Sequence, residues 1–257
     1  MCTIILLRHA HPAFPTIVAA NRDELYARVT RPPHLLARSP RVLAGLDVEH
    51  HGTWMGVNEH GVLVGLTNQR TFRPRDTSKR TRGEIALGAL RAGTLADAEA
   101  FLAGIDPAVY NPFNLVVADA HGARAYYGRD GWSREDIPAG LSVLPNDRLD
   151  SPWFPKVARA RALVAPLLSL PWPELRPALF RALGDHDKPE AFPPTPPGID
   201  RAFVRELHAL CVHTPVYGTR SAMVAALRPG AVAEVWFADG PPCTTAPVDA
   251  TPLLAVR

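Results

Sequence analysis

Short runs of apolar residues in the first half of the chain have the pattern of β-strands. Residues 3–7 form a continuous apolar run with β-branched members, which predicts a strand buried on both faces. The chain then turns, and residues 16–20 predict the returning strand. Two further hairpins are predicted, one from residues 53–57 and 62–66 around Gly61, the other from residues 113–118 and 123–127.

Helical periodicity follows these hairpins, and a last strand pair ends the pattern. The predicted helices cover residues 83–91, 95–102, 153–168 and 172–183. Residues 187–198 are rich in proline and predict a stiff, exposed connection, and the final strands are expected at 221–227 and 231–237. Strand hairpins mixed with helix pairs predict an α+β fold, with two stacked sheets between helical layers.

The composition is that of an ordinary globular protein, with 257 residues, 47% hydrophobic and 21% charged. This length suits one large domain or two small ones. No apolar run is long enough for a transmembrane helix, and residues 4–7 are too short for a signal peptide. The three cysteines, Cys2, Cys211 and Cys243, form no disulfide framework, which indicates a reducing, cytoplasmic location. No two of them have zinc-ligand spacing, so no metal site is expected.

The formal net charge of the chain is only +3, but residues 70–82 are strongly basic. This segment contains one acidic residue, Asp76, and six basic residues: Arg70, Arg73, Arg75, Lys79, Arg80 and Arg82. The segment is either a solvated surface loop or a cradle for an anionic ligand. Phe72 is its one residue for stacking on bases, so nucleic-acid binding is not expected.

Cys2 is the candidate nucleophile. A small residue at position two favours removal of Met1, which would give Cys2 a free α-amine. The reference pKa of that amine is about 7.7–8.0 and that of a thiol about 8.5, so the amine can accept the thiol proton. The alternative is that Cys2 is a small buried hydrophobe with no chemical role.

Three polar residues could complete such a site. Asp23 ends the returning strand, and an antiparallel pair would bring its carboxylate beside the amine of Cys2. Asn68 and Asn146, each at the end of a predicted strand, could donate hydrogen bonds to an oxyanion. Each of the two asparagines could instead be an ordinary turn residue.

A series of short motifs gives the chain a family resemblance. They occur in this order: MCTI, AANRDE, GLD at 45–47, GTWMGV at 52–57, LTN at 66–68, RGEI at 82–85, FNLVVAD at 113–119, YYG, and YGTR at 217–220. Together they resemble the NRDE family, also called the transport and Golgi organisation family. That family is similar to the N-terminal-nucleophile hydrolases of the choloylglycine hydrolase and penicillin V acylase group.

The resemblance implies a four-layer αββα sandwich in one domain spanning residues 1–257. It also implies that Cys2 is the nucleophile, that Asp23 is the partner of its amine, and that Asn68 and Asn146 are donors on the oxyanion side. Arg22, Arg220 and Trp54 are expected to bind the substrate. The chain departs from the hydrolases in having Ala20 where they have an arginine.

Two functions remain open at this point. The first is an amidohydrolase that cleaves a non-peptide C–N bond through a thioester on Cys2 and needs no cofactor. The second is a non-catalytic carrier of haem or of an acyl or acyl-CoA ligand, in keeping with the haem trafficking and lipid metabolism linked to the family. Three histidines near the GTW motif, His50, His51 and His60, are candidates for a haem site.

Overall fold

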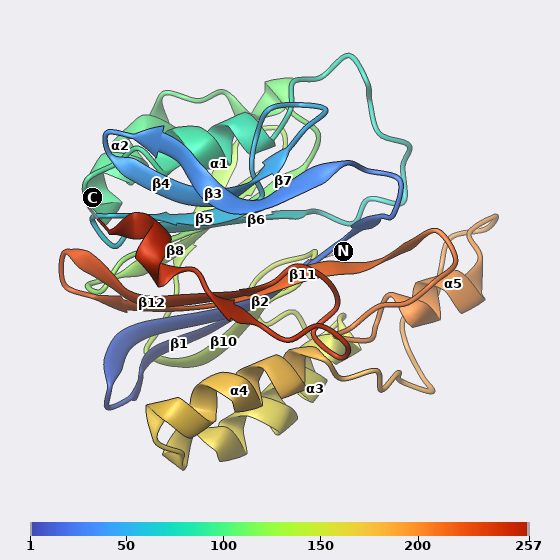
Figure 1. The fold of residues 1–257 in the computed structure, drawn as a ribbon. Helices are drawn as coiled ribbons and strands as arrows, with labels where there is room; N and C mark the ends of the chain where they lie inside the picture. The colour runs from blue at the N-terminus through green and yellow to red at the C-terminus, as the bar shows by residue number, and fades with distance from the viewer. Residues whose placement is uncertain (1, 256–257) are drawn as a thin grey trace.

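The protein is a sandwich of two antiparallel sheets between two helical layers. The computed structural model describes residues 2–255, and Figure 1 shows the sheets stacked face to face with helices above and below. This arrangement confirms the predicted α+β fold with four layers.

Both sheets are fully antiparallel. The six-stranded sheet has the order β10 (Gly140–Leu144), β1 (Thr3–His11), β2 (Phe14–Leu25), β11 (Tyr217–Arg228), β12 (Ala231–Ala238), β13 (Val248–Asp249). The seven-stranded sheet has the order β3 (Thr30–Arg38), β4 (Arg41–Asp47), β5 (Met55–Asn58), β6 (Leu63–Asn68), β7 (Phe113–Ala118), β8 (Ala123–Gly128), β9 (Trp132–Asp136).

Each sheet carries one helix pair on its outer face. Helices α1 (Gly83–Ala89) and α2 (Leu95–Ala103) cover the seven-stranded sheet, and α3 (Pro155–Val164) and α4 (Trp172–Leu183) cover the six-stranded one. The remaining helical elements are short: α5 (Arg201–Glu206), η1 (Pro107–Val109), η2 (Ala165–Ser169) and η3 (Thr251–Leu254). No helix in the described part of the chain is both long and apolar enough to cross a membrane.

The strand period of two explains why the central strands are apolar throughout. In β1, Ile4 and Leu6 belong to the core between the sheets, while Ile5 and Leu7 belong to the core beneath α3 and α4. Successive side chains point to opposite faces of a strand, so a strand buried on both faces must be apolar at every position. The continuous apolar run at residues 3–7 is the sequence signature of this burial.

The predicted strands and helices are all present, and several are longer than predicted. The strand predicted at residues 16–20 extends over Phe14–Leu25, so the NRDE motif lies inside β2 rather than after it. Strand β3 was not predicted because it contains Pro32 and Pro33. It lies at the edge of its sheet, where a residue without an N–H is tolerated.

A close backbone crossing joins the start of α1 to the segment before β5. The Thr53 N–H donates to the Gly83 carbonyl at 3.1 Å. A Cβ added at Gly52 would lie 2.6 Å from the carbonyl carbon of Gly83 and 2.7 Å from its Cα. Gly52 of the GTW motif and Gly83 of the RGE motif are therefore both needed for this close backbone contact. The contact fixes the position of the C-terminal end of the basic segment 70–82.

We expect Gly52→Ala to destabilise the protein by about 1–3 kcal/mol, because backbone atoms must shift to admit the methyl group. Urea denaturation would measure this loss. The matched control is Gly131→Ala, at a position where an added Cβ meets nothing within 4 Å, and it should leave the stability almost unchanged. Equal midpoints for both variants would contradict the crossing.

Candidate functional site

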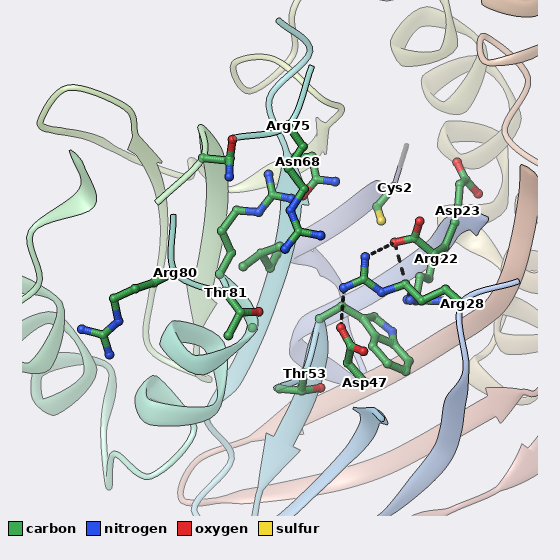
Figure 2. A pocket seen from close by; sticks show the side chains of 16 residues that line it. Cys2, Arg22, Asp23, Arg28, Asp47, Thr53, Asn68, Arg75, Arg80 and Thr81 are labelled. Atoms are coloured by element: carbon green, nitrogen blue, oxygen red, sulfur yellow. Dashed lines mark hydrogen bonds and ion pairs between the residues drawn. The ribbon is translucent and has the colours of Figure 1, made fainter. Parts of the chain in front are cut away.

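The pairing of β1 with β2 places Cys2 beside the NRDE motif. Thr3 is opposite Asn21 in this antiparallel pair, so Cys2 comes level with Arg22. Cys2 is half-buried, and Figure 2 shows its sulfur on one side of a hollow with Arg22 and Asp23 close by. The structure thus brings together the two residues, Cys2 and Asp23, on which the predicted site depends.

Asn21 and Asp23 are anchored on the face of β2 that turns away from the inter-sheet core. Nδ2 of Asn21 donates to two carbonyl groups, Leu183 O at 2.8 Å and Leu210 O at 2.9 Å. The hydroxyl of Thr219 donates to Oδ1 of Asp23 at 2.6 Å. Asn21 therefore serves the scaffold, and the carboxylate of Asp23 is held in a fixed orientation.

Arg22 and Trp54 form the opposite face of the site. The Arg22 guanidinium lies over the Trp54 ring, 4.1 Å from its centroid. Gly45 makes room for this ring, since a Cβ there would lie 2.4 Å from two of its carbons. Burial lowers the pKa of Arg22, while the carboxylate of Glu24 opposes that effect. Two of the three predicted substrate-binding residues, Arg22 and Trp54, line the hollow beside Cys2.

The electrostatics of Cys2 favour the neutral thiol. Burial raises its pKa, and the nearby carboxylate of Asp23 raises it further. A backbone hydrogen bond from Asp23 and the guanidinium of Arg22 act in the opposite direction. Since the thiolate is the reactive form, a proton acceptor beside the sulfur would be required for attack.

Lys156 is a buried neighbour of the site that the sequence analysis missed. Its side chain is fully buried, and Nζ donates to the Thr3 hydroxyl at 3.2 Å. Burial lowers the pKa of Lys156, while the carboxylate of Asp23 opposes that effect, as would the thiolate form of Cys2. A signal was present: Lys156 falls on the helical stripe of Ala160 and Val164, where a charged residue is unusual.

The hollow in front of Cys2 is rich in guanidinium groups. Its sixteen lining residues include Arg75, Arg80 and Arg82 from the basic segment, and Figure 2 shows Arg75 and Asn68 across from Cys2. Burial lowers the pKa of Arg82 to about 10, and the nearby charge of Arg75 adds to this effect. Arg82 is thus still charged at neutral pH.

Two acidic groups of the same hollow are already engaged by one arginine. The guanidinium of Arg28 contacts Asp47 at 2.5 Å and Glu24 at 3.3 Å. The hydrogen bond and the charge of Arg28 lower the pKa of Asp47, although burial alone would raise it. Arg75 and Arg82 line the same hollow, where Nη1 of Arg82 donates to the Pro112 carbonyl at 3.2 Å.

The rest of the basic segment lies elsewhere. Arg70 and Arg73 line a second hollow that reaches the α5 region and has a largely apolar wall. The following residues form that wall: Phe72, Ile199, Phe203, Val204, Leu207 and Tyr217. The segment is therefore divided between two hollows rather than forming one cradle.

Asn68 and Asn146 are neighbours, but only Asn68 lines the hollow of Cys2. Nδ2 of Asn146 donates to the Asn68 carbonyl at 2.6 Å, and Asn146 lines the second hollow. Asn146 is thus placed to position Asn68. Their roles as oxyanion donors stay predictions.

Arg220 is not among the residues that line the hollow of Cys2 in the described part of the chain. Its Nη1 donates to the carbonyl groups of Leu25, Tyr26 and Arg28, at 3.0, 2.8 and 3.3 Å. These contacts hold the turn after β2. Substrate binding by Arg220 gains no support from this position.

The three histidines near the GTW motif are exposed or nearly so. His50 lies beside Arg75, with 3.3 Å between Nε2 and the guanidinium, and His51 has a positive φ of 54°. His60 belongs to the tight turn between β5 and β6. A haem site at these residues stays a prediction.

Known proteins resemble this chain in sequence, and others resemble it in fold. The family model described as Transport and Golgi organisation 2 matches residues 1–236. The "Transport and Golgi organization protein 2 homolog" of Bos taurus is 32% identical over 248 residues, which is 87% of each chain. Its counterpart in Homo sapiens is 31% identical over 246 residues, which is 86% of each chain.

Solved structures extend the comparison to more distant proteins. A penicillin V acylase from Agrobacterium tumefaciens matches with a TM-score of 0.57 at 15% identity, over 97% of this chain and 86% of that one. This match shows the fold alone, the αββα sandwich of the N-terminal-nucleophile hydrolases. With the family match over most of its length, the chain belongs to the Transport and Golgi organisation 2 family.

Proposed function

We propose that this protein is a cysteine N-terminal-nucleophile amidohydrolase that cleaves a non-peptide C–N bond of a small anionic amide. The observation that carries the proposal is the position of Cys2, beside Asp23 and in front of a hollow lined by Arg75 and Arg82. The hydrolase-type fold, shared with an acylase, supports the same chemistry.

The proposed reaction begins with a chain from which Met1 has been removed. Met1 itself lies outside the described residues. The free α-amine of Cys2 accepts the thiol proton while the sulfur attacks the amide carbonyl carbon. The C–N bond then breaks, the leaving amine takes up that proton, and a thioester remains on Cys2. Water hydrolyses the thioester, which releases a carboxylic acid and restores the thiol.

Asp23 and Lys156 supply charges of opposite sign to this step. The carboxylate of Asp23 would hold the α-ammonium of Cys2 in place, and Thr219 fixes that carboxylate. Lys156 would limit the negative charge around the thiol, since Cys2 and Asp23 both favour its protonated form. Asn68 would donate a hydrogen bond to the oxyanion, because its side-chain amide lines the same hollow as Cys2.

The lining of the hollow favours an anionic substrate. Arg28 is paired with Asp47 and Glu24, whereas the mutual repulsion of Arg75 and Arg82 helps to lower the pKa of Arg82. A carboxylate or phosphate on the substrate would relieve that repulsion and accept a pair of hydrogen bonds. Trp54, packed beneath Arg22, would cover an apolar part of the same ligand.

Removal of Met1 is the first testable requirement. Intact-mass analysis of active protein should show a chain that begins at Cys2, and an activated acyl ester should add one acyl group. Cys2→Ala should lose this acylation and slow amide hydrolysis by at least about 10³-fold, because the nucleophile is gone.

The matched control for this test is a variant with leucine inserted between Met1 and Cys2, which keeps Met1 in place. It retains the thiol but lacks the amine, so we expect alkylation of Cys2 to persist and turnover to be lost. Full activity in a chain that retains Met1 would overturn the mechanism.

Charge recognition is the second requirement. We expect Arg82→Gln to raise KM for an amide that carries a carboxylate by about 10- to 100-fold, as befits one lost charged hydrogen bond, with little change in kcat. KM for a neutral amide of the same size should stay constant. Arg73→Gln, in the same segment but at the second hollow, is the control. An equal effect of Arg82→Gln on both substrates would argue against an anion site.

A second candidate function rests on the second hollow. Its apolar wall and the charges of Arg70 and Arg73 would suit an acyl chain with an anionic head group, or haem with its propionates. In this carrier function Cys2→Ala would bind as well as the natural chain. Titration with acyl-CoA and with haem, followed by absorbance and Tm, would test it. The absence of a saturable shift with either ligand would exclude the carrier function.

A further inference from the structure

Two histidines and two cysteines meet at a site distinct from the hollow of Cys2. They are His186, Cys211, His213 and Cys243. His186 follows α4, Cys211 and His213 precede β11, and Cys243 follows β12. One ligand atom from each lies within 4.8 Å of all the others. The cysteine spacing gave no sign of this cluster, because folding joins three separate segments of the chain.

The distances within this cluster match the edges of a tetrahedron around a metal ion. Sγ of Cys211 lies 3.7 Å from Sγ of Cys243 and 3.5 Å from Nε2 of His213. Nε2 of His213 lies 3.4 Å from Sγ of Cys243. Bond lengths of about 2.3 Å to sulfur and 2.0–2.1 Å to nitrogen give tetrahedral edges of about 3.8 Å for S–S and 3.6 Å for S–N.

His186 would supply the fourth ligand, and its ring centroid lies 5.0 Å from that of His213. Its Nδ1 lies 3.1 Å from the backbone carbonyl of Cys211. When Nδ1–H donates to that carbonyl, the lone pair of Nε2 is free for a metal ion. A ligand histidine usually has its other ring nitrogen held by a carbonyl or a carboxylate in this way.

Contacts outside the cluster bring the three segments close together. The Cys211 N–H donates to the Asp185 carbonyl at 2.9 Å, and the Asp185 carboxylate is bound by Arg159 at 2.6 and 2.9 Å. Gly184 allows the close approach of the third segment, since a Cβ there would lie 3.3 Å from Cα and N of Cys243. The four ligands are therefore arranged in advance.

We propose that these four side chains bind one zinc ion in a tetrahedral site with two sulfur and two nitrogen ligands. Such a donor set selects zinc among the common divalent cations, and four protein ligands leave no open position for catalysis. The ion would cross-link the end of α4, the segment before β11 and the loop after β12.

The proposed zinc site is connected to Asp23 by two hydrogen bonds. Val212, between the two ligands Cys211 and His213, donates its N–H to the Thr219 hydroxyl at 2.9 Å. That hydroxyl donates to Oδ1 of Asp23 at 2.6 Å. Zinc would thus stabilise the segment that orients Asp23, whether or not the protein is a hydrolase.

The direct test is metal binding by the full chain, purified with a phosphine reductant and no chelator. We expect about one zinc per chain by mass spectrometry of the elements, and saturable binding to the stripped protein in competition with a chromophoric chelator. Cobalt in place of zinc should give the strong visible absorption of a tetrahedral site with thiolate ligands. Zinc should raise Tm by several degrees.

The variants separate this site from the others. Cys243→Ser and His213→Ala, both on exposed side chains, should weaken zinc binding at least about tenfold, by loss of one ligand. Cys2→Ser and His60→Ala should bind zinc like the natural chain, which controls for adventitious thiol and histidine binding. The absence of saturable zinc binding by the reduced natural chain would overturn the proposal. Undiminished zinc binding by Cys243→Ser would also overturn the proposal. A Cys211–Cys243 disulfide in the purified chain would overturn it too, if the same chain binds no zinc after reduction.

Discussion

The antiparallel pairing of β1 with β2 is the constraint on which the rest of the site depends. Its register puts Thr3 opposite Asn21 and so brings Cys2 level with Arg22. The period of two then sends alternate residues of the NRDE motif to opposite faces of the sheet. Arg22 meets Trp54 near the inter-sheet core, and Asn21 and Asp23 meet the elements on the helical side. A shift of one residue in this register would exchange the two sets.

The fold could be predicted from the sequence because its signals are local. The apolar run of β1, the hairpin around Gly61 and the stripe of α4 each indicate their element without reference to a partner. Strand β3, which was not predicted, lacks such a signal. In β3 two prolines break the pattern, and the edge position that tolerates them is a property of the assembled sheet.

The site was only partly predictable for a related reason. Cys2 and Asp23 belong to strands adjacent in sequence, so a simple hairpin argument brings them together. Lys156 reaches the same site from a helix more than a hundred residues away, and its hydrogen bond to Thr3 depends on how α3 packs on the sheet. Arg75 lines the hollow of Cys2 and Arg70 lines the second hollow. This separation depends on the course of the loop between them, which a hydrophobic periodicity does not predict.

The two hydrogen bonds of the Asn21 side chain affect how a loss-of-function substitution at this position should be interpreted. Its amide binds one carbonyl at the end of α4 and another just before Cys211, so it fastens two distant stretches of chain to the central sheet. The first residue of the NRDE motif therefore stabilises the fold, whereas the third, Asp23, lines the hollow of Cys2. A damaging change at Asn21 would be a folding defect, and the amount of protein in the cell would reveal it before any assay of activity.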